Sequence, residues 1–521
     1  MNKPIVVSLT AAMALSALAG CGGWTPTEGT QGKGDASGKP LKFSLSLPVT
    51  TTTGYQARVT DWSNDKLVKQ LEKLTHTELS IRIMEDSKMS VMFAGNDIPD
   101  VVGSIGTPTS KSMAGSVEAG VFMPLDDLLK QYAPNLLKKV PKAAWDAVSF
   151  NGKIYGIPDY LSNPSRRGTY IRTDLLEKAG LRPPQTIDEF LNVLRAFKKM
   201  GVENPYQMRD SFKYADLVLG AFDVLPFKDQ FEVVGGQVQP KFFDVENMEK
   251  ALQTYKTMLD EGFIPKDFAT ISSADYSKSI NSGKAGMWSS NATGLISFRT
   301  PIRQVVPDAK VDIIPSPKGP EGKGGYFFYT PAVRTFYINK NVDKERAIGI
   351  VKFYEWMTTE EAEKFFTFGI EGENYTVDNG KINYKIPATK EEQEEESFRQ
   401  STLWMGQDAT LSPPRKRLEL DQNGKDVLNA FDNVLDKEGL PGIGFYPDLA
   451  AFAKYPDLAP PRPDVGPKLI IDHMVKMIYG KEPITDWPKV IEEYKSKGGN
   501  EILKEANERY SKKDGVLEIK R

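Results

Sequence analysis

The chain has 521 residues, of which 40% are hydrophobic, 10% aromatic and 26% charged. This composition excludes a disordered chain, and the length exceeds the roughly 100 to 200 residues that are typical of one domain. The 67 basic and 69 acidic side chains nearly cancel, which argues against nucleic acid as a partner because no global field would attract it. With one cysteine and two histidines, an internal disulfide framework and a structural Cys/His zinc site are excluded as well.

The first twenty residues have the pattern of an export signal. Lys3 supplies a cationic start, and the residues from Ile5 to Leu18 are almost wholly apolar or small. This run is shorter than the about 20 residues that a membrane helix needs, and no later stretch approaches that length without charges or prolines. Residues 1–20 are therefore predicted to be a signal peptide.

The apolar run ends in Leu18-Ala19-Gly20-Cys21, which resembles the lipobox of bacterial lipoproteins. The resemblance implies lipidation of the Cys21 sulfur, cleavage before it, and anchoring of the protein at the extracytoplasmic face of the cell membrane. The alternative is an ordinary signal peptide with an incidental thiol. Residues 21–39 are rich in Gly, Thr, Ser and Pro, so we predict a flexible tether behind the lipid anchor.

Strands alternate with helices after the tether. Residues 41–47 alternate apolar and polar side chains as a half-buried strand does, and 67–74 carry an apolar stripe with helical spacing. A second strand follows at 79–83, then a helix at 89–94 and a strand at 100–102. This order predicts an α/β fold with a ligand crevice at the strand ends.

Two later helices are predicted from the residues at their ends. Thr186 and Glu189 form a capping box, and Gly201 is suited to the C-cap of the same helix. The second helix spans about 246–261. The acidic run 391–396 is interpreted as a solvated helix face rather than a cation site.

Several stretches carry a family resemblance through their shared order along the chain. They are Ala94–Val101, Asn151–Pro158, Tyr170–Leu181 with Thr186–Phe190, Ser282–Met287 and Asp486-Trp487. Together they resemble the extracellular solute-binding lipoproteins of ABC importers, in the large oligosaccharide-binding subgroup that includes alginate and pectin-fragment binders. The resemblance implies a type II periplasmic-binding-protein-like fold, in which two α/β lobes close about a hinge over an oligosaccharide and present it to an ABC permease.

The expected lobes are each built from two parts of the chain. Lobe 1 is expected to comprise 40–168 plus about 311–345, and lobe 2 to comprise 169–310 plus about 346–521. The strand at Tyr170-Ile171-Arg172 is the expected crossing between the lobes, and Val311 to Ile314 is the expected return.

We expect a monomer that carries no cofactor and no metal. Some alginate-type relatives have a calcium loop, rich in Asp and Asn, after the helix that corresponds to 190–200. Residues 199–205 of this chain lack such a series of Asp and Asn side chains with ligating oxygens.

Three tryptophans are candidate platforms for a sugar. Sugar rings have apolar C–H faces and a fringe of hydroxyls, so their sites combine flat aromatic rings with hydrogen-bonding and planar charged groups. Trp288 precedes a polar Ser-Ser-Asn stretch that we read as a loop, Trp404 follows a polar helix, and Trp62 follows a Thr-rich loop. The alternative is a core position for Trp288 and a helix-stapling role for Trp62.

Polar candidates come from the strand-like stretch near 329, from the loop before 168 and from the turn near 96. Arginine forks match carboxylates in a bidentate way, so an acidic sugar such as a uronate is one interpretation, and ordinary solvated arginines are the other. The predicted polar contacts are Tyr329, Arg334, Arg166, Arg167, Asn96 and Asp97.

Two other functions stay open at this point. An exported glycoside-active enzyme would need two carboxylates facing each other across the crevice, and no local motif marks such a pair. The chain also has no Ser nucleophile elbow, metal-ligand spacing or Gly-rich phosphate loop, so we expect no catalysis. The third function is that of a ligand-sensing lipoprotein that contacts a membrane receptor kinase.

Overall fold

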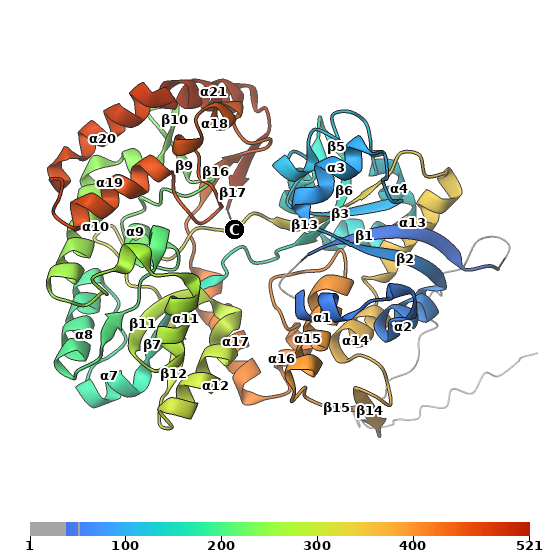
Figure 1. Ribbon diagram of the computed structural model, residues 1–521, viewed down its shortest axis with the longest axis horizontal. Coiled ribbons are helices and arrows are strands. Elements are labelled where there is room, and N and C mark those ends of the chain that lie inside the picture. The colour runs from blue at the N-terminus through green and yellow to red at the C-terminus, as the bar shows by residue number, and fades with distance from the viewer. Residues whose placement is uncertain (1–37, 50–52, 521) are drawn as a thin grey trace, which may run out of the picture.

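The computed structural model describes residues 38–49 and 53–520, so the predicted signal peptide, Cys21 and nearly all of the tether lie outside the described residues. Two lobes lie side by side, joined near the middle of the molecule (Figure 1). Among the described residues, none of the helices has the length and apolar character needed to cross a membrane.

Lobe 1 is built on a five-stranded sheet in the order β2-β1-β3-β13-β6. The strands are β1 (Leu41–Pro48), β2 (Thr77–Met84), β3 (Val101–Ile105), β6 (Gly156–Tyr160) and β13 (Ala332–Ile338). β1 runs parallel to β2 and β3, whereas β13 runs antiparallel to both β3 and β6. The helices of this lobe are α1 (Thr53–Arg58), α2 (Lys66–Thr75), α3 (Met89–Ala94), α4 (Asp126–Tyr132), α5 (Pro134–Lys139), α6 (Lys142–Ala147), α13 (Lys344–Trp356), α14 (Glu360–Phe368) and α15 (Lys390–Ser397).

Lobe 2 contains two four-stranded sheets. The first has the order β12-β7-β11-β8, formed by β7 (Arg167–Arg172), β8 (Asn204–Tyr206), β11 (Ala285–Asn291) and β12 (Val311–Ile314). The second is formed by β9 (Phe231–Val234), β10 (Gln237–Pro240), β16 (Gly442–Phe445) and β17 (Val516–Ile519). The helices of lobe 2 are α7 (Thr173–Ala179), α8 (Ile187–Lys199), α9 (Leu217–Ala221), α10 (Val245–Asp260), α11 (Ser273–Asn281), α12 (Leu295–Val305), α16 (Arg415–Leu418), α17 (Gln422–Asn433), α18 (Ala450–Lys454), α19 (Lys468–Ile478), α20 (Trp487–Tyr494) and α21 (Asn500–Lys512).

The strands and helices expected between residues 41 and 102 are present. α2 forms where the apolar stripe was predicted, and it buries Leu67, Val68 and Leu71 because these positions fall on one helical face. Further along, Thr186 caps α8 by accepting a hydrogen bond from the Glu189 amide at 3.2 Å. The Glu189 carboxylate accepts from the Gln185 amide at 2.7 Å rather than from Thr186, so the predicted capping box is shifted by one residue.

The acidic run 391–396 lies on α15, none of whose residues is buried, and several of its carboxylates also form ion pairs. Glu394 pairs with Arg58, Glu395 pairs with Lys66 at 2.9 Å, and Glu396 pairs with Arg417 at 2.9 Å. The first two pairs hold α15 on lobe 1. The third reaches α16 of lobe 2, so this helix contributes a contact between the lobes.

The lobe cores differ from the expected boundaries at two places. Val311 to Ile314 form β12, which pairs with β7 inside lobe 2 and does not cross between the lobes. The chain returns from lobe 2 to lobe 1 later in the sequence. Phe327 packs in the core of lobe 2, and the next residue, Phe328, packs in the core of lobe 1. Residues between 346 and 405, which we expected in lobe 2, place Ile350, Phe366 and other side chains in the core of lobe 1.

Three chain segments cross between the lobes and hydrogen-bond to one another. The first leaves β6, the second leads into β13, and the third follows residue 404. The Leu161 amide donates to the Pro331 carbonyl and the Tyr329 amide to the Pro164 carbonyl, each at 2.9 Å. The Tyr160 amide donates to the Gln407 carbonyl at 2.9 Å, and the Ala409 amide donates back to Tyr160 at 2.7 Å. We call these hydrogen-bonded segments, 160–166, 328–331 and 404–411, the hinge ribbon.

A buried ion pair fixes the hinge ribbon to lobe 1. Arg334 donates to Asp159 at 2.6 Å and to the carbonyls of Thr402 and Trp404 at 2.9 and 3.0 Å. The other Asp159 oxygen accepts from the amides of Gly406 and Gln407 at 2.7 and 3.3 Å. Both charged side chains are almost fully buried, so Arg334 joins two strands and one crossing segment at a single point.

We expect Arg334→Met to lower the free energy of unfolding by about 3–5 kcal/mol, because it leaves Asp159 buried without its counter-ion. Urea denaturation followed by tryptophan fluorescence measures the loss. The control is Arg195→Met, since Arg195 pairs with Glu261 at 2.7 Å in an exposed position on α8, where the expected loss is below about 1 kcal/mol. Equal losses in the two variants would contradict the role of Arg334.

A second prediction concerns Asp229, which follows α9 in lobe 2. Its carboxyl accepts a hydrogen bond from the Tyr446 hydroxyl at 2.8 Å, and the residue is 7% exposed. Burial raises the pKa of this carboxyl from 3.8 to about 6. The folded protein therefore holds the proton more tightly than the unfolded chain does. Its contribution to stability is complete below pH 3.8 and is lost as the pH rises through about 6.

We expect Asp229→Asn to remove this dependence and to raise the free energy of unfolding at pH 8 by up to about 3 kcal/mol. Asparagine also tolerates the left-handed backbone at this position, where φ is 61°. Melting temperatures of the wild type and the variant between pH 4 and pH 8 provide the measurement. A variant with the pH dependence of the wild type would show that another group is responsible.

Candidate functional site

The two lobes face each other across the edges at which their parallel strands end. In lobe 1, β1, β2, β3 and β6 all end at the edge where β13 begins. In lobe 2, β8, β11 and β12 end at the edge where β7 begins. The hinge ribbon connects these two edges. Because ligands of α/β folds bind outside the carboxyl ends of the strands, the crevice between the lobes is the candidate site.

Two cavities lie between the lobes. The smaller, of about 380 Å³, is lined by the hinge ribbon, by the end of α13 in lobe 1 and by α17 in lobe 2. The larger, of about 1180 Å³, lies between α12 and β12 of lobe 2 and α15 of lobe 1. Both are in the size range of small-molecule sites or above it. Residues from both lobes line each cavity, so a ligand bound there would contact both.

Trp404 and Trp62 are the tryptophans with some access to solvent among the three candidates. Trp404 lines the smaller cavity, is 8% exposed and stacks on Phe366 at 5.2 Å, with its indole N–H donated to the Met357 carbonyl. Trp62 is half-buried, and the centre of its ring lies 5.2 Å from the centre of the Phe398 ring. Each ring therefore has one side fixed by lobe 1.

Trp288 does not lie in a polar loop. It is the fourth residue of β11, is completely buried, and stacks on Tyr170 at 5.4 Å with an angle of 13° between the rings. The loop expectation is wrong because the Ser-Ser-Asn residues after Trp288 continue the strand into the centre of the sheet, paired with β7. The indole N–H has no hydrogen-bond partner.

The neighbouring arginines Arg166 and Arg167 have different surroundings. Arg167 is 1% exposed and donates to Asp216 at 2.6 Å, to Asp464 at 2.9 Å and to the Tyr329 hydroxyl at 3.2 Å. Burial opposes ionisation of Asp464, but Arg167 and Lys213 outweigh it and lower the pKa of this carboxyl. The Arg167 guanidinium is thus fully engaged inside lobe 2, as that of Arg334 is inside lobe 1.

Arg166 and Tyr329 lie together where the hinge ribbon meets lobe 2. Both are half-buried, and the Arg166 guanidinium lies 5.9 Å from the centre of the Tyr329 ring. The Tyr329 hydroxyl donates to the Asn291 side chain at 3.1 Å, at the end of β11. These two predicted residues are therefore brought together at the crevice edge of lobe 2.

Asn96 and Asp97 lie at the opposite edge of the lobe 1 sheet. They follow α3 and precede β3, so they lie where β3 begins rather than where it ends. Asn96 has a left-handed φ of 52°, and Asp97 pairs with Arg82 at 2.7 Å. The turn was expected at the crevice, but the strand direction places it away from the edge that faces lobe 2.

The sequence analysis missed a loop at the crevice edge of lobe 2. Ser211, Phe212 and Tyr214 follow β8 and all have left-handed backbones, with φ values of 57°, 56° and 57°. Such strained positions concentrate at functional sites. The Tyr214 ring lies 4.5 Å from the Arg167 guanidinium, and Lys213 pairs with Asp464 at 3.0 Å. No periodic pattern marks this loop, because its conformation depends on the neighbouring ion pairs.

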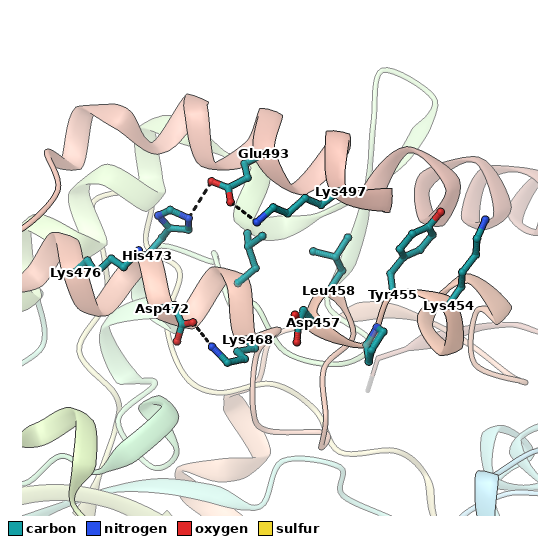
Figure 2. A pocket seen from close by; sticks show the side chains of 12 residues that line it. Lys454, Tyr455, Asp457, Leu458, Lys468, Asp472, His473, Lys476, Glu493 and Lys497 are labelled. Carbon is teal, nitrogen blue, oxygen red and sulfur yellow. Dashed lines mark hydrogen bonds and ion pairs between the residues drawn. The ribbon is translucent and has the colours of Figure 1, made fainter.

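A third cavity, of about 540 Å³, lies within lobe 2 between α18, α19 and α20 (Figure 2). Its wall carries several lysines, each paired with a carboxylate, as Lys497 is with Glu493 at 2.8 Å. His473 lies between Glu482 and Glu493, at 2.6 and 3.2 Å. Only lobe 2 lines this cavity, so closure of the lobes would not enclose a ligand there.

The described part of the chain has no group of three or more His, Cys, Asp and Glu side chains that could hold a metal ion. In the segment after α8, the acidic side chain Glu203 pairs with Lys284 at 2.9 Å.

The model of the bacterial extracellular solute-binding proteins matches residues 59–364, more than half of the chain. The chain belongs to this family. The polygalacturonan/rhamnogalacturonan-binding protein YtcQ of Bacillus subtilis (strain 168) is 27% identical over 530 residues, which cover 98% of this solute-binding protein and 99% of the relative. Lipoprotein LipO of the same organism is 27% identical over 465 residues, with 85% and 88% covered.

Solved structures share the fold of this solute-binding protein. The alginate-binding protein AlgQ2 without calcium ion has a TM-score of 0.62 and 19% identity, covering 92% of this chain and 100% of that structure. FusA of S. pneumoniae in complex with kestose has a TM-score of 0.64 and 15% identity, with 90% and 99% covered. The predicted two-lobed α/β fold is confirmed.

The burial of Trp288 leads to a prediction that separates a structural role from a binding role. We expect Trp288→Ala to lower the free energy of unfolding by about 3–5 kcal/mol, because it leaves a large cavity in the core. Trp288→Phe retains an aromatic ring beside Tyr170, so its ligand affinity should stay within about threefold of the wild type. Denaturation and calorimetric titration measure the two quantities. A stable Phe variant with much weaker binding would instead identify Trp288 as a ligand contact.

Proposed function

We propose that this solute-binding protein captures an oligosaccharide between its lobes and delivers it, intact, to the transmembrane subunits of an ABC permease. It acts as a monomer, held at the extracytoplasmic face of the cell membrane by lipid on Cys21. The observation that carries the proposal is the pair of cavities lined by both lobes beside a three-segment hinge. A ligand that contacts both lobes stabilises their closed arrangement, and opening then releases it.

The chemistry of the crevice supports a carbohydrate ligand. The Trp404 ring lines the smaller cavity, and the hinge ribbon places Ser162, Asn163 and Thr410 around it. Trp62 adds a half-buried aromatic ring on lobe 1. Flat rings and hydroxyl or amide groups are the partners that sugar faces and sugar hydroxyls require. YtcQ is named as a polygalacturonan/rhamnogalacturonan-binding protein and FusA was solved in complex with kestose, and both agree with this class of ligand.

The lipid anchor and the lack of catalysis are supported by the relatives. LipO is named as a lipoprotein, and the family and YtcQ are named as binding proteins. The export signal and the thiol at Cys21 fit the same location. A ligand-sensing role would use the same crevice and differ only in the membrane partner.

The proposal is tested with a panel of purified neutral and acidic oligosaccharides. We expect one of them to raise the melting temperature, to quench tryptophan fluorescence, and to be recovered unchanged by chromatography. Trp62→Ala should lower the affinity for this ligand by about three- to tenfold, because it removes one aromatic contact. Trp145→Phe is the control, since Trp145, unlike Trp62, is buried in the lobe 1 core. Turnover of the ligand would favour an enzyme instead, and no binding by any member of the panel would contradict the proposal.

A further inference from the structure

Arg166 differs from the other candidate arginines because its guanidinium has no partner in the described part of the chain. Arg167 and Arg334 each bond to a buried aspartate and to further acceptors. Among the residues that the structure describes, Arg166 forms no ion pair and no side-chain hydrogen bond, and its guanidinium lies over the Tyr329 ring at 5.9 Å from the ring centre. Its Nε is completely buried and has no acceptor.

This arrangement is unfavourable for the free protein. Burial lowers the pKa of the Arg166 guanidinium, because removing the cation from water costs more solvation than the nearby Tyr329, Asp408 and Tyr214 side chains restore. Asp408 is the carboxylate among these groups, and its Oδ1 accepts from the amides of Ser162 and Thr410 at 3.2 and 3.0 Å. A half-buried cation whose N–H groups lack an acceptor is thus kept at the crevice edge. Burial of such a charge does not stabilise the fold.

The surroundings of Arg166 hold the guanidinium in place. The Arg166 carbonyl accepts from the Ala292 amide at 2.8 Å, which fixes the backbone to the end of β11. The Tyr329 hydroxyl bonds to Asn291 and to Arg167, which fixes the ring beneath the guanidinium. The fork is therefore oriented before any ligand arrives, and orientation in advance lowers the entropic cost of binding.

On the basis of the proposed function, we propose that Arg166 binds a carboxylate of the oligosaccharide and that this protein therefore selects uronate-containing chains. The planar fork of arginine matches a carboxylate through two parallel charge-assisted hydrogen bonds, whereas the hydroxyls of a neutral sugar accept hydrogen bonds without supplying a counter-charge.

The test compares trigalacturonate with its fully methyl-esterified form, by calorimetric titration of the mature full-length protein. The two ligands have the same sugar hydroxyls and differ in the carboxylates. We expect the wild type to bind the acid about ten- to a hundredfold more tightly than the ester, the range for a hydrogen-bonded charged contact. Arg166→Gln should reduce this preference to about threefold or less, mainly by lowering the affinity for trigalacturonate.

Two further variants separate recognition from structure. Arg166→Lys keeps the charge without the fork, so it should retain part of the preference for the acid. Arg195→Gln removes an exposed arginine that pairs with Glu261 far from the crevice, and it should keep the full preference. Without ligand, Arg166→Gln should melt at the wild-type temperature or above it, because no partner is lost.

The outcomes distinguish this inference from the proposed function. Equal binding of acid and ester by the wild type, or an unchanged preference in Arg166→Gln, would overturn the role of Arg166 and leave oligosaccharide capture standing. Binding of neutral oligosaccharides but of no uronate would likewise overturn the role of Arg166 and leave oligosaccharide capture standing. Failure to bind any oligosaccharide would contradict the proposed function itself, and the inference with it.

Discussion

The passage of three chain segments between the lobes is the constraint on which the rest of the structure depends. Each segment would leave backbone amides and carbonyls without partners if it crossed alone, and buried backbone groups must be paired. The hinge ribbon solves this by hydrogen-bonding the segments to one another at Tyr160, Leu161 and Tyr329. The same pairing fixes the distance between the facing sheet edges, so the ribbon determines where a crevice between the lobes lies.

Buried arginines hold each end of the ribbon. Arg334 with Asp159 anchors it to lobe 1, and Arg167 with Asp216 and Asp464 anchors it to lobe 2. A buried charge is tolerated when it is paired and hydrogen-bonded, which makes such pairs specific points of attachment. Lobe motion is thereby restricted to the short segments between the two anchors, and Arg166 lies beside one of them.

The sequence predicted local structure well and long-range placement poorly. β1, α2 and α8 depend on apolar periodicity and end signals within about ten residues, which the sequence shows directly. The return crossing and the lobe of residues 346–405 were misplaced because periodicity shows which face of a helix is buried, but not which sheet covers it. Asn96 and Asp97 were misplaced for a related reason, since a turn motif does not show at which edge of the sheet it lies.

The sequence by itself determined the α/β class and the family through the order of its motifs, and it predicts an export signal that ends at Cys21. The tertiary structure decided which candidate side chains are accessible. Trp288 and Arg167 have the residue types of a sugar site, yet β7, β11 and two distant aspartates bury them. Arg166, one residue away, has no such partners. The physical reason is that burial and pairing are set by segments far apart in the chain, so neighbours in sequence can have opposite surroundings.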